Sequence, residues 1–519
     1  MLKKWGIALL AVAMMLVTAA CSNSSSTTAG GGKDKNDLKV ALTAAPPTLD
    51  LHRTTAMLTQ EVSWHIFENL VTLNSKYQVV PMLAEKIEIS QDGKTFTFPL
   101  RKDITFHNGK AMTADDVVAS LERWRKYSTI GRSSLAKGTI EAKDKNTVVI
   151  TLPQASGTLL PALATGVQGA VIMPKEILDE AGDGNVKQFI GTGPFQFVEW
   201  KQDQYIHLKK FANYKALAGE PDGLAGKKEA KVDNIYFIPV SDTATRVAGI
   251  QSGEYDFAEE IPFDNYEALK NDPNLVVSVA KPSRYLGLIF NTKTGMFANA
   301  KLRQAVNTGI DLDAIMKAVT GNAMFYELDP GLAFKEQVWY VDSGKDKYNL
   351  KNPELAKKLL AEAGYNGETI TILSTRDYDY MYKSAVVVKD QLEKLGMNVK
   401  VEVYDWPTLL SRRADDKAWN IFFTGFGIMT EPTQTLFLDS RNKWAGWYNN
   451  PKVDALLDEM RGSTNFDDAK KSFAQAQGLF WEDVPVIKIG NLHRLNAYRK
   501  NVKGVNFFME NSYWNVSVK

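Results

Sequence analysis

Three apolar segments, TITIL (369–373), NVKVEV (398–403) and WNIFFTGFG (419–427), decide the fold predicted for this chain of 519 residues. Valine alternates with polar residues in the second, and the third is a continuous apolar run typical of a strand buried on both faces. Apolar residues at helical spacing follow the first segment as far as Gly396, and a short polar helix precedes the third. Alternating strands and helices of these lengths predict right-handed crossovers and a mostly parallel sheet, and therefore an α/β fold.

The three strands lead into polar, aromatic and glycine residues at their carboxyl ends. In open α/β sheets, ligands collect at that edge. The first strand is followed by Arg376, Asp377 and Tyr378, the second by Asp405 and Trp406, and the third by Gly425, Phe426, Gly427 and then Glu431. These residues would place charge, aromatic surface and accessible backbone side by side. Strand ends always continue into loops, so ordinary loop residues are the alternative interpretation.

A hairpin and a capped helix are predicted nearer the N-terminus. Residues 87–100, IEISQDGKTFTFPL, alternate apolar and polar positions on both sides of Asp92-Gly93, as expected of two strands and their turn. Pro99 cannot donate a ladder hydrogen bond, which favours the edge of a sheet for its strand. In the segment that follows, Thr113 is positioned to cap a helix.

Size and charge limit the class of protein. A chain of this length with 44% apolar residues exceeds what one core usually organises, so two or more domains are expected. Lys and Arg together number 62, and Asp and Glu 60. This neutral balance argues against nucleic acid as a partner, because its binding normally needs a clustered basic surface. The single cysteine excludes a disulfide within the chain.

The N-terminal residues indicate export. A basic start precedes the apolar run 5–17, which is shorter than the roughly 20 residues that span a bilayer, so residues 1–20 are expected to be a signal peptide. Small residues lead to Cys21, and the stretch resembles a bacterial lipobox, which implies lipid attachment at Cys21. Two acyl chains would anchor the protein durably, with residues 21–37 as a flexible tether. The alternative is ordinary secretion with Cys21 left as a free thiol.

Six stretches in the same order along the chain resemble one family, the extracellular solute-binding proteins (family 5) of peptide and nickel ABC importers. They are LAEKIEISQDGKTFTFPLRKDITFHNGKAMTADDVVASLERW (83–124), GTGPFQFVEW (191–200), VDNIYFIPVSDTATRVAGIQSGEYDF (232–257), YLGLIFNTKTGMFANAKLRQAVNTGIDLDAI (285–315), AKKLLAEAGY (356–365) and WAGWYNNPKVDALLDEM (444–460). The order of all six makes the resemblance far more specific than any one of them.

The resemblance implies a two-lobed α/β receptor of the periplasmic-binding-protein type, with an additional subdomain inserted in the first lobe. Residues 38–74, 195–285 and 495–519 would form lobe I, residues 75–194 the inserted subdomain, and residues 286–494 lobe II. Such a receptor is a monomer without a cofactor, closes about a hinge around its ligand, and delivers the ligand to membrane permease subunits. It would lie on the outer face of the cell membrane in a Gram-positive organism, or in the periplasm of a Gram-negative one.

Peptides are the first ligand class that the resemblance implies. Dipeptide-binding members place an arginine for the ligand carboxylate at the position of Arg376, with Tyr378 beside it; a surface salt bridge is the alternative role for this arginine. The aspartate that holds the ligand amine in those members corresponds to Ile428 here, and Glu431 is the only carboxylate left in that loop. A longer peptide held by its backbone, or a modified peptide, would therefore fit as well as a free dipeptide.

Several further residues are expected at the ligand. Trp406, Trp444 and Trp447 could form apolar or stacking walls, although tryptophan is also common in cores. Asn291 could hold backbone groups of an extended ligand, although capping of a turn would explain it equally well.

Other ligands and functions stay open at this stage. A nickel chelate would require imidazole, yet the five histidines, His52, His65, His107, His207 and His493, are scattered, and no metal-ligand set is predicted. Oligosaccharide receptors occur in the same family, and a lipid-anchored ligand sensor is a third possibility. An enzyme is not expected, because neither GxSxG nor HExxH occurs in the sequence.

Overall fold

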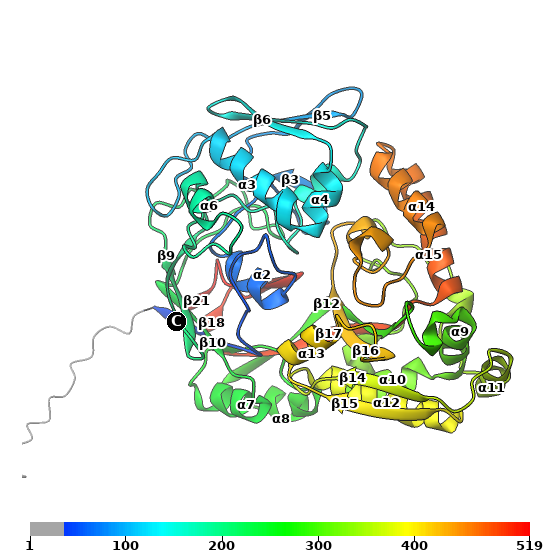
Figure 1. Ribbon diagram of the computed structural model, residues 1–519. Helices are drawn as coiled ribbons and strands as arrows, with labels where there is room; N and C mark the ends of the chain where they lie inside the picture. Colours follow the sequence, from blue (N-terminus) through cyan, green and yellow to red (C-terminus); the bar gives the residue numbers. More distant parts are fainter. Residues whose placement is uncertain (1–35) are drawn as a thin grey trace, which may run out of the picture.

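The computed structural model describes residues 36–519. The predicted signal peptide and Cys21 lie outside the described residues, and β1 begins at Asp37, the last residue assigned to the tether. No helix in this part of the chain combines the length and apolar character needed to cross a bilayer. The fold is mixed α/β, as the sequence predicts (Figure 1).

One sheet of eleven strands runs through the molecule. Its order is β15 (Asn398–Val403), β14 (Thr369–Ser374), β16 (Ile421–Gly427), β12 (Leu275–Phe290), β17 (Val486–Arg499), β11 (Phe257–Ala258), β1 (Asp37–Leu42), β10 (Asn234–Pro239), β9 (Tyr205–Lys210) and β8 (Phe195–Lys201), and β13 (Tyr326–Glu327) pairs with β17. β14 pairs in parallel with both β15 and β16, as predicted for these three strands. The prediction of a mostly parallel sheet is wrong for the sheet as a whole, because β12 pairs antiparallel with β16 and β17, β9 with β8 and β10, and β17 with β11 and β13. We call the part around β1 and β8–β11 lobe I and the part around β14–β16 lobe II.

Two long strands, β12 and β17, are shared by the two lobes. They pair with each other over 275–280, beside β11, and over 284–289, beside β16. The register shifts between Ala280 and Arg284. An irregularity of this kind bends a strand locally, so this two-stranded connection is where movement of one lobe against the other is expected.

A separate four-stranded sheet lies at the top of Figure 1, and we call the part of the structure around it the inserted subdomain. Its order is β4 (Glu88–Ile89), β5 (Thr95–Pro99), β7 (Thr147–Thr151) and β6 (Thr139–Asp144). The pairing of β4 with β5 confirms the hairpin, and α3 (Ala114–Tyr127) begins at Thr113 with a capping box. The edge position predicted for the strand of Pro99 is wrong, because β5 lies between β4 and β7. Pro99 is tolerated as the last residue of that strand.

The remaining elements cover the sheets. In the subdomain they are α4 (Thr129–Leu135), α5 (Leu159–Leu163) and α6 (Lys175–Ala181); in lobe I, α2 (Met57–Ser63), α7 (Thr243–Ser252), α8 (Tyr266–Lys270) and the short strands β2 (Val71–Leu73), β3 (Val79–Pro81), β18 (Val502–Lys503), β19 (Asn506–Phe508), β20 (Glu510–Ser512) and β21 (Ser517–Val518). In lobe II they are α9 (Ala300–Gly309), α10 (Leu312–Thr320), α11 (Pro353–Glu362), α12 (Asp379–Lys394), α13 (Trp406–Arg412), α14 (Pro451–Gly462) and α15 (Phe466–Asp483).

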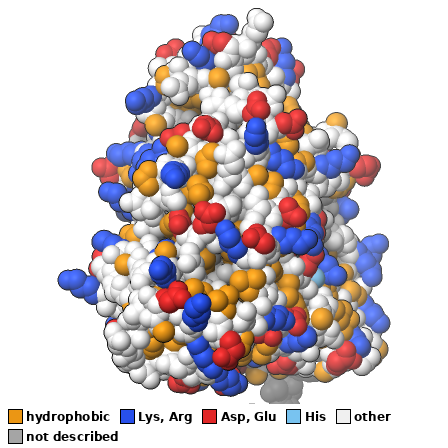
Figure 2. Space-filling view, turned by 90° about the vertical axis from the view of Figure 1, so that its right-hand side faces the viewer, with side chains coloured by type: hydrophobic (Ala, Val, Ile, Leu, Met, Phe, Trp, Pro, Cys, Tyr) orange, Lys and Arg blue, Asp and Glu red, His pale blue; other side chains and the backbone are white. Residues whose placement is uncertain are grey.

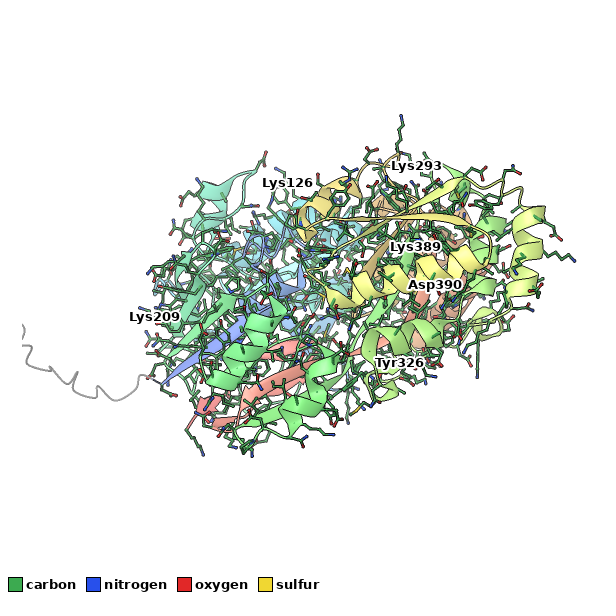
Figure 3. The ribbon with its side chains drawn as sticks, turned by 90° about the horizontal axis from the view of Figure 1, so that it is seen from below. Lys126, Lys209, Lys293, Tyr326, Lys389 and Asp390 are labelled. Carbon is green, nitrogen blue, oxygen red and sulfur yellow. The ribbon has the colours of Figure 1, made fainter. Side chains whose placement is uncertain are left out.

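The amphipathic character of α12 explains how it is placed. Val388 and Leu392 are buried toward β14–β16, whereas Lys389 is half-buried and Asp390 is exposed, and both form ion pairs one turn further along the helix (Figure 3). The face that carries α9, α11, α14 and α15 shows basic and acidic side chains interspersed, without a broad area of one sign (Figure 2). This face therefore has no basic stripe of the kind that binds nucleic acid.

Candidate functional site

A cavity of about 310 Å³ lies between the two lobes. Lobe I contributes the loop after β1, α2 and residues that follow β11, whereas lobe II contributes the carboxyl ends of β14 and β16 together with α13. The volume is at the lower end of the range for small-molecule pockets, roughly 300–1,000 Å³. The cavity therefore suits a small ligand that contacts both lobes.

Five of the residues predicted from strand ends line this cavity, namely Tyr378, Trp406, Gly425, Phe426 and Gly427, and so does Trp444, predicted as a possible wall. Tyr378 and Trp406 meet edge to face with ring centroids 5.1 Å apart, and Phe426 and Trp444 lie 5.6 Å apart. These pairs form two aromatic walls on lobe II. Parallel strands bring their ends to one edge, which is why residues distant in sequence meet here.

Glycines let the backbone of β16 approach the cavity closely. A Cβ atom added to Gly425 would lie 2.9 Å from both Arg284 Cδ and the Tyr380 hydroxyl. A Cβ on Gly427 would point to more open space, with Met57 Cε at 3.9 Å as its nearest neighbour. Position 425 therefore requires glycine for packing, whereas at position 427 the missing side chain leaves room in the cavity.

Two predicted polar contacts lie outside the cavity lining. Arg376 is exposed, donates to the Tyr382 hydroxyl at 3.1 Å and lies over the Tyr382 ring. Glu431 is buried, and its carboxylate accepts hydrogen bonds from the backbone N–H of Thr433 at 2.7 Å and from the Thr433 hydroxyl at 2.5 Å. Burial raises the pKa of Glu431. Glu431 thus caps a short turn, and the ligand roles predicted for both residues gain no support from this geometry.

Trp447 and Asn291 also lie outside the lining. Trp447 stacks on Trp419 with ring centroids 5.6 Å apart. Asn291 is buried and donates to the carbonyl oxygens of Asp416 at 2.7 Å and Trp419 at 3.1 Å. The surroundings of Trp447 fit the alternative of core packing, and those of Asn291 fit the alternative of turn capping.

Arg413 lines the cavity although no sequence pattern indicated it. It follows α13 directly, is half-buried, and lies over the rings of Trp444 and Phe422 at 5.6 and 5.9 Å. Within residues 36–519, no carboxylate or carbonyl oxygen binds its guanidinium. Burial lowers the pKa of Arg413 to about 10, so the group stays cationic at neutral pH. A cation that is half-buried without an anionic partner has lost part of its hydration, and an anionic ligand group would compensate for that loss.

Lobe I presents carboxylates to the same cavity. Glu61 comes from α2, Glu259 and Glu260 follow β11, and Glu510 begins β20. Arg284 and Arg494 stand beside them, at the irregularity between β12 and β17. The strand-end rule that located the lobe II residues would also have found the two glutamates after β11, since the sequence there reads DFAEE.

Comparison with known proteins agrees with this geometry. The family described as bacterial extracellular solute-binding proteins, family 5, matches residues 78–447. The chain belongs to this family. A probable peptide ABC transporter periplasmic-binding protein of Sinorhizobium fredii is 30% identical, with 87% of this chain and 88% of the relative covered. The glutathione-binding protein GsiB of Pectobacterium atrosepticum is 29% identical, with 90% and 91% covered. The solved structure of AgaA from A. tumefaciens R10 with agropinic acid has a TM-score of 0.81 at 27% identity, with 93% and 99% covered.

Hydrogen bonds join lobe II of this family 5 protein to the inserted subdomain, as expected of a closed state. Gln434 of lobe II accepts from the Thr165 hydroxyl at 3.2 Å and donates to the Pro161 carbonyl oxygen at 3.3 Å, both in the inserted subdomain. The Gly157 N–H donates to the Arg461 carbonyl oxygen at 3.1 Å. These bonds join segments that separate when the lobes open.

Gln434→Ala is expected to weaken ligand binding about three- to tenfold, mainly through faster dissociation. The two bonds of Gln434 to the inserted subdomain, worth about 1 kcal/mol each, exist only in the closed state, so their loss shifts the population toward the open state. Its third bond, from the Thr430 N–H at 3.2 Å, lies within lobe II. Stopped-flow or surface-plasmon measurements of dissociation would detect the change. Gln304→Ala is the matched control, because Gln304 donates to Glu482 within lobe II. An unchanged dissociation rate in Gln434→Ala would contradict a role in closure.

The histidines of this family 5 protein do not face the cavity. His52, His65 and His107 are each held at both ring nitrogens, and burial lowers their pKa values. His207 stacks on Tyr236, and His493 Nδ1–H donates to the Met324 carbonyl oxygen at 2.9 Å. Among the described residues, no group of three or more His, Cys, Asp or Glu side chains is placed to hold a metal ion. A nickel chelate would therefore bind here without imidazole from the cavity lining.

Proposed function

We propose that this protein is the substrate-binding receptor of an ABC importer, and that it captures short peptides in the interlobe cavity. The observation that carries the proposal is a cavity between two lobes whose lobe II wall holds an unpaired arginine beside two pairs of aromatic rings. The relatives named above as peptide and glutathione binders support a peptide as ligand, because glutathione is itself a modified tripeptide.

In this proposal Arg413 binds the ligand carboxylate. A guanidinium forms charge-assisted hydrogen bonds to a carboxylate with a matching fork geometry. Trp444 and Trp406 would pack against apolar side chains of the ligand, and Gly427 would let its backbone lie close to β16. Arg376 is the alternative carboxylate anchor inherited from the family pattern, and substitution of each arginine in turn separates the two assignments.

Closure of the lobes would convert binding into a signal for the permease. Only contacts that differ between the open and closed states shift the population, and a ligand that touches both lobes supplies such contacts. We further propose that the receptor acts as a monomer on the outer face of the membrane, held there by lipid on Cys21. A receptor role rather than catalysis accords with the family, and mass spectrometry that recovers an added peptide unchanged would support it.

The proposed ligand class is tested by a thermal-shift screen of the purified protein. The panel holds di- to pentapeptides, the same peptides amidated or acetylated at their ends, glutathione, agropinic acid, nickel with histidine, and oligosaccharides. Short peptides with a free carboxylate are expected to raise the unfolding temperature most, since a ligand stabilises the state that it binds. A shift confined to nickel, opines or sugars would overturn the peptide assignment.

A further inference from the structure

Charged groups on the lobe I side of the cavity leave one carboxylate without a matching cation. Four glutamates lie together there, Glu61, Glu259, Glu260 and Glu510. Two arginines, Arg284 and Arg494, line the cavity beside them, and Arg246 of α7 lies behind. Burial makes such an imbalance costly, because each ionised group has lost most of its water. The cluster is therefore one positive charge short.

The pairing within the cluster shows where that charge is missing. Arg284 donates to Glu260 at 2.5 Å, and Arg494 pairs with Glu510 at 2.5 Å. Arg246 makes its hydrogen bonds to backbone carbonyl oxygens, among them that of Glu259. Glu61 has no cation within hydrogen-bonding distance, and its nearest is Arg494 Nη1 at 3.8 Å.

The nearest neutral groups do not make up the deficit. The Tyr513 hydroxyl lies 2.6 Å from Glu259 and 3.2 Å from Glu61, and Asn511 donates to Glu259 at 2.7 Å. These groups solvate the two carboxylates but bring no charge.

A second observation points to a ligand at the same place. Arg494 is only 4% exposed, yet its Nε and Nη1 atoms make no hydrogen bond within residues 36–519. Each faces a carboxylate across 3.8 Å, Nε toward Glu260 and Nη1 toward Glu61. That separation is too long for a hydrogen bond, and a buried donor left unpaired costs about 1–3 kcal/mol. Arg494 therefore has two N–H donors without an acceptor, directly beside a cluster with one carboxylate more than its cations.

The opposite wall carries the opposite charge. Every carboxylate in the cavity lining comes from lobe I, and the unpaired Arg413 comes from lobe II. Ile428, at the position where the family pattern places an amine-binding aspartate, lines the lobe II wall instead. The charges that a ligand meets are thus divided between the lobes.

We infer that the ligand carries a free amino group, and that the lobe I cluster of Glu61, Glu259, Glu260 and Glu510 binds its ammonium while Arg413 binds a carboxylate on lobe II. The carbonyl oxygen next to an α-amino group would accept from Arg494. The inference rests on the proposed function and deepens it. The ligand is a zwitterion whose two ends attach to different lobes, so both charges favour closure.

Protonation of the cluster gives this inference a direct readout. Burial raises the pKa of Glu61 well above its usual value, and the adjacent Glu259 carboxylate raises it further. In the free protein, a proton on Glu61 would therefore take the place of the missing cation. A ligand ammonium would displace it, so binding would release up to about one proton. Affinity should then rise with pH until the ligand amine itself deprotonates, near 7.7–8.0 for an α-amino group.

Isothermal titration calorimetry with Ala-Phe and Ala-Ala-Phe, free and N-acetylated, tests the inference. Acetylation is expected to weaken binding to the wild type about tenfold or more. In Glu61→Gln, which mimics the protonated acid and should fold, free peptides are expected to lose most of that advantage. Titrations in buffers of different ionisation enthalpy should show proton release for free peptides with the wild type, but none for acetylated peptides or for Glu61→Gln.

Glu68→Gln is the matched control, because Glu68 is a buried lobe I glutamate that binds Tyr214 and Thr192 away from this cavity. The control should keep both the preference for a free amine and the proton release. Equal affinity for free and acetylated peptides without proton release would overturn the inference and leave the proposed function standing. Failure of every peptide to bind, free or blocked, would overturn the proposed function and the inference with it.

Discussion

Arg413→Gln is expected to bind a peptide with a free carboxylate about 10- to 100-fold more weakly than the wild type. A charge-assisted hydrogen bond contributes about 1.5–3 kcal/mol, which corresponds to that range of affinity. The ligand-free variant should be at least as stable to heat as the wild type, because it no longer holds a half-buried cation without an anionic partner. Calorimetry and thermal unfolding without ligand measure the two effects separately.

Arg412→Gln controls for the loss of an arginine at the end of α13. Arg412 is exposed, lies over the Tyr404 ring and stands 3.6 Å from Glu402, outside the cavity. Peptides amidated at the C-terminus complete the comparison, since they should bind the wild type and Arg413→Gln with similar affinity. If Arg413→Gln kept full affinity while Arg376→Gln lost it, the carboxylate anchor would be Arg376.

Gly427→Leu is expected to abolish detectable binding, a loss of more than about 100-fold for any ligand of the cavity. The new side chain would extend from the end of β16 into the 310 Å³ cavity and occupy space that the ligand needs. The fold itself should tolerate it, because an added Cβ lies no closer than 3.9 Å to a neighbouring atom. Thermal shift with the wild-type ligand, together with unfolding of the free protein, would show loss of binding without loss of stability.

Gly478→Leu is the control for adding the same side chain elsewhere. Gly478 lies within α15, where a Cβ would meet nothing within 4 Å, and leucine favours a helix over glycine by roughly 0.5–1 kcal/mol. This variant should bind normally and unfold at the same or a higher temperature. Normal binding by Gly427→Leu would mean that the ligand lies outside this cavity.

The lobe II half of the fold and site could be predicted because local pattern and tertiary position agree there. The strands at 369–374 and 421–427 are largely buried, whereas the edge strand at 398–403 is half-buried to exposed. All three pair in parallel, so their carboxyl ends lie at the same edge of the sheet, as their order along the chain predicts. Tyr378, Trp406 and the glycines of β16 therefore lie where the strand-end rule puts them.

The remainder of the site depends on geometry that spacing does not encode. Arg376 follows a strand end as predicted, but its side chain is held outside by the Tyr382 ring. Arg413 lies at the end of a helix, where the strand-end rule gives no signal. Glu61 and Glu510 reach the cavity from elements far apart in the sequence, and only the folded chain brings them together. The strand of Pro99 shows the same limit, since its place in the sheet depends on a partner some 50 residues further along.

The two long strands common to both lobes also bear on how the lobes could respond to a bound ligand. Arg284 and Arg494 lie on those strands beside the shift in their register, so a bound ligand would contact the hinge as well as the two lobes. A small rotation at the hinge produces a larger displacement at the distant contact between lobe II and the inserted subdomain, where Gln434 meets Thr165. Lobe closure could then respond to a small ligand because the rotation at the hinge is amplified with distance. An extensive contact surface between ligand and protein would not be needed.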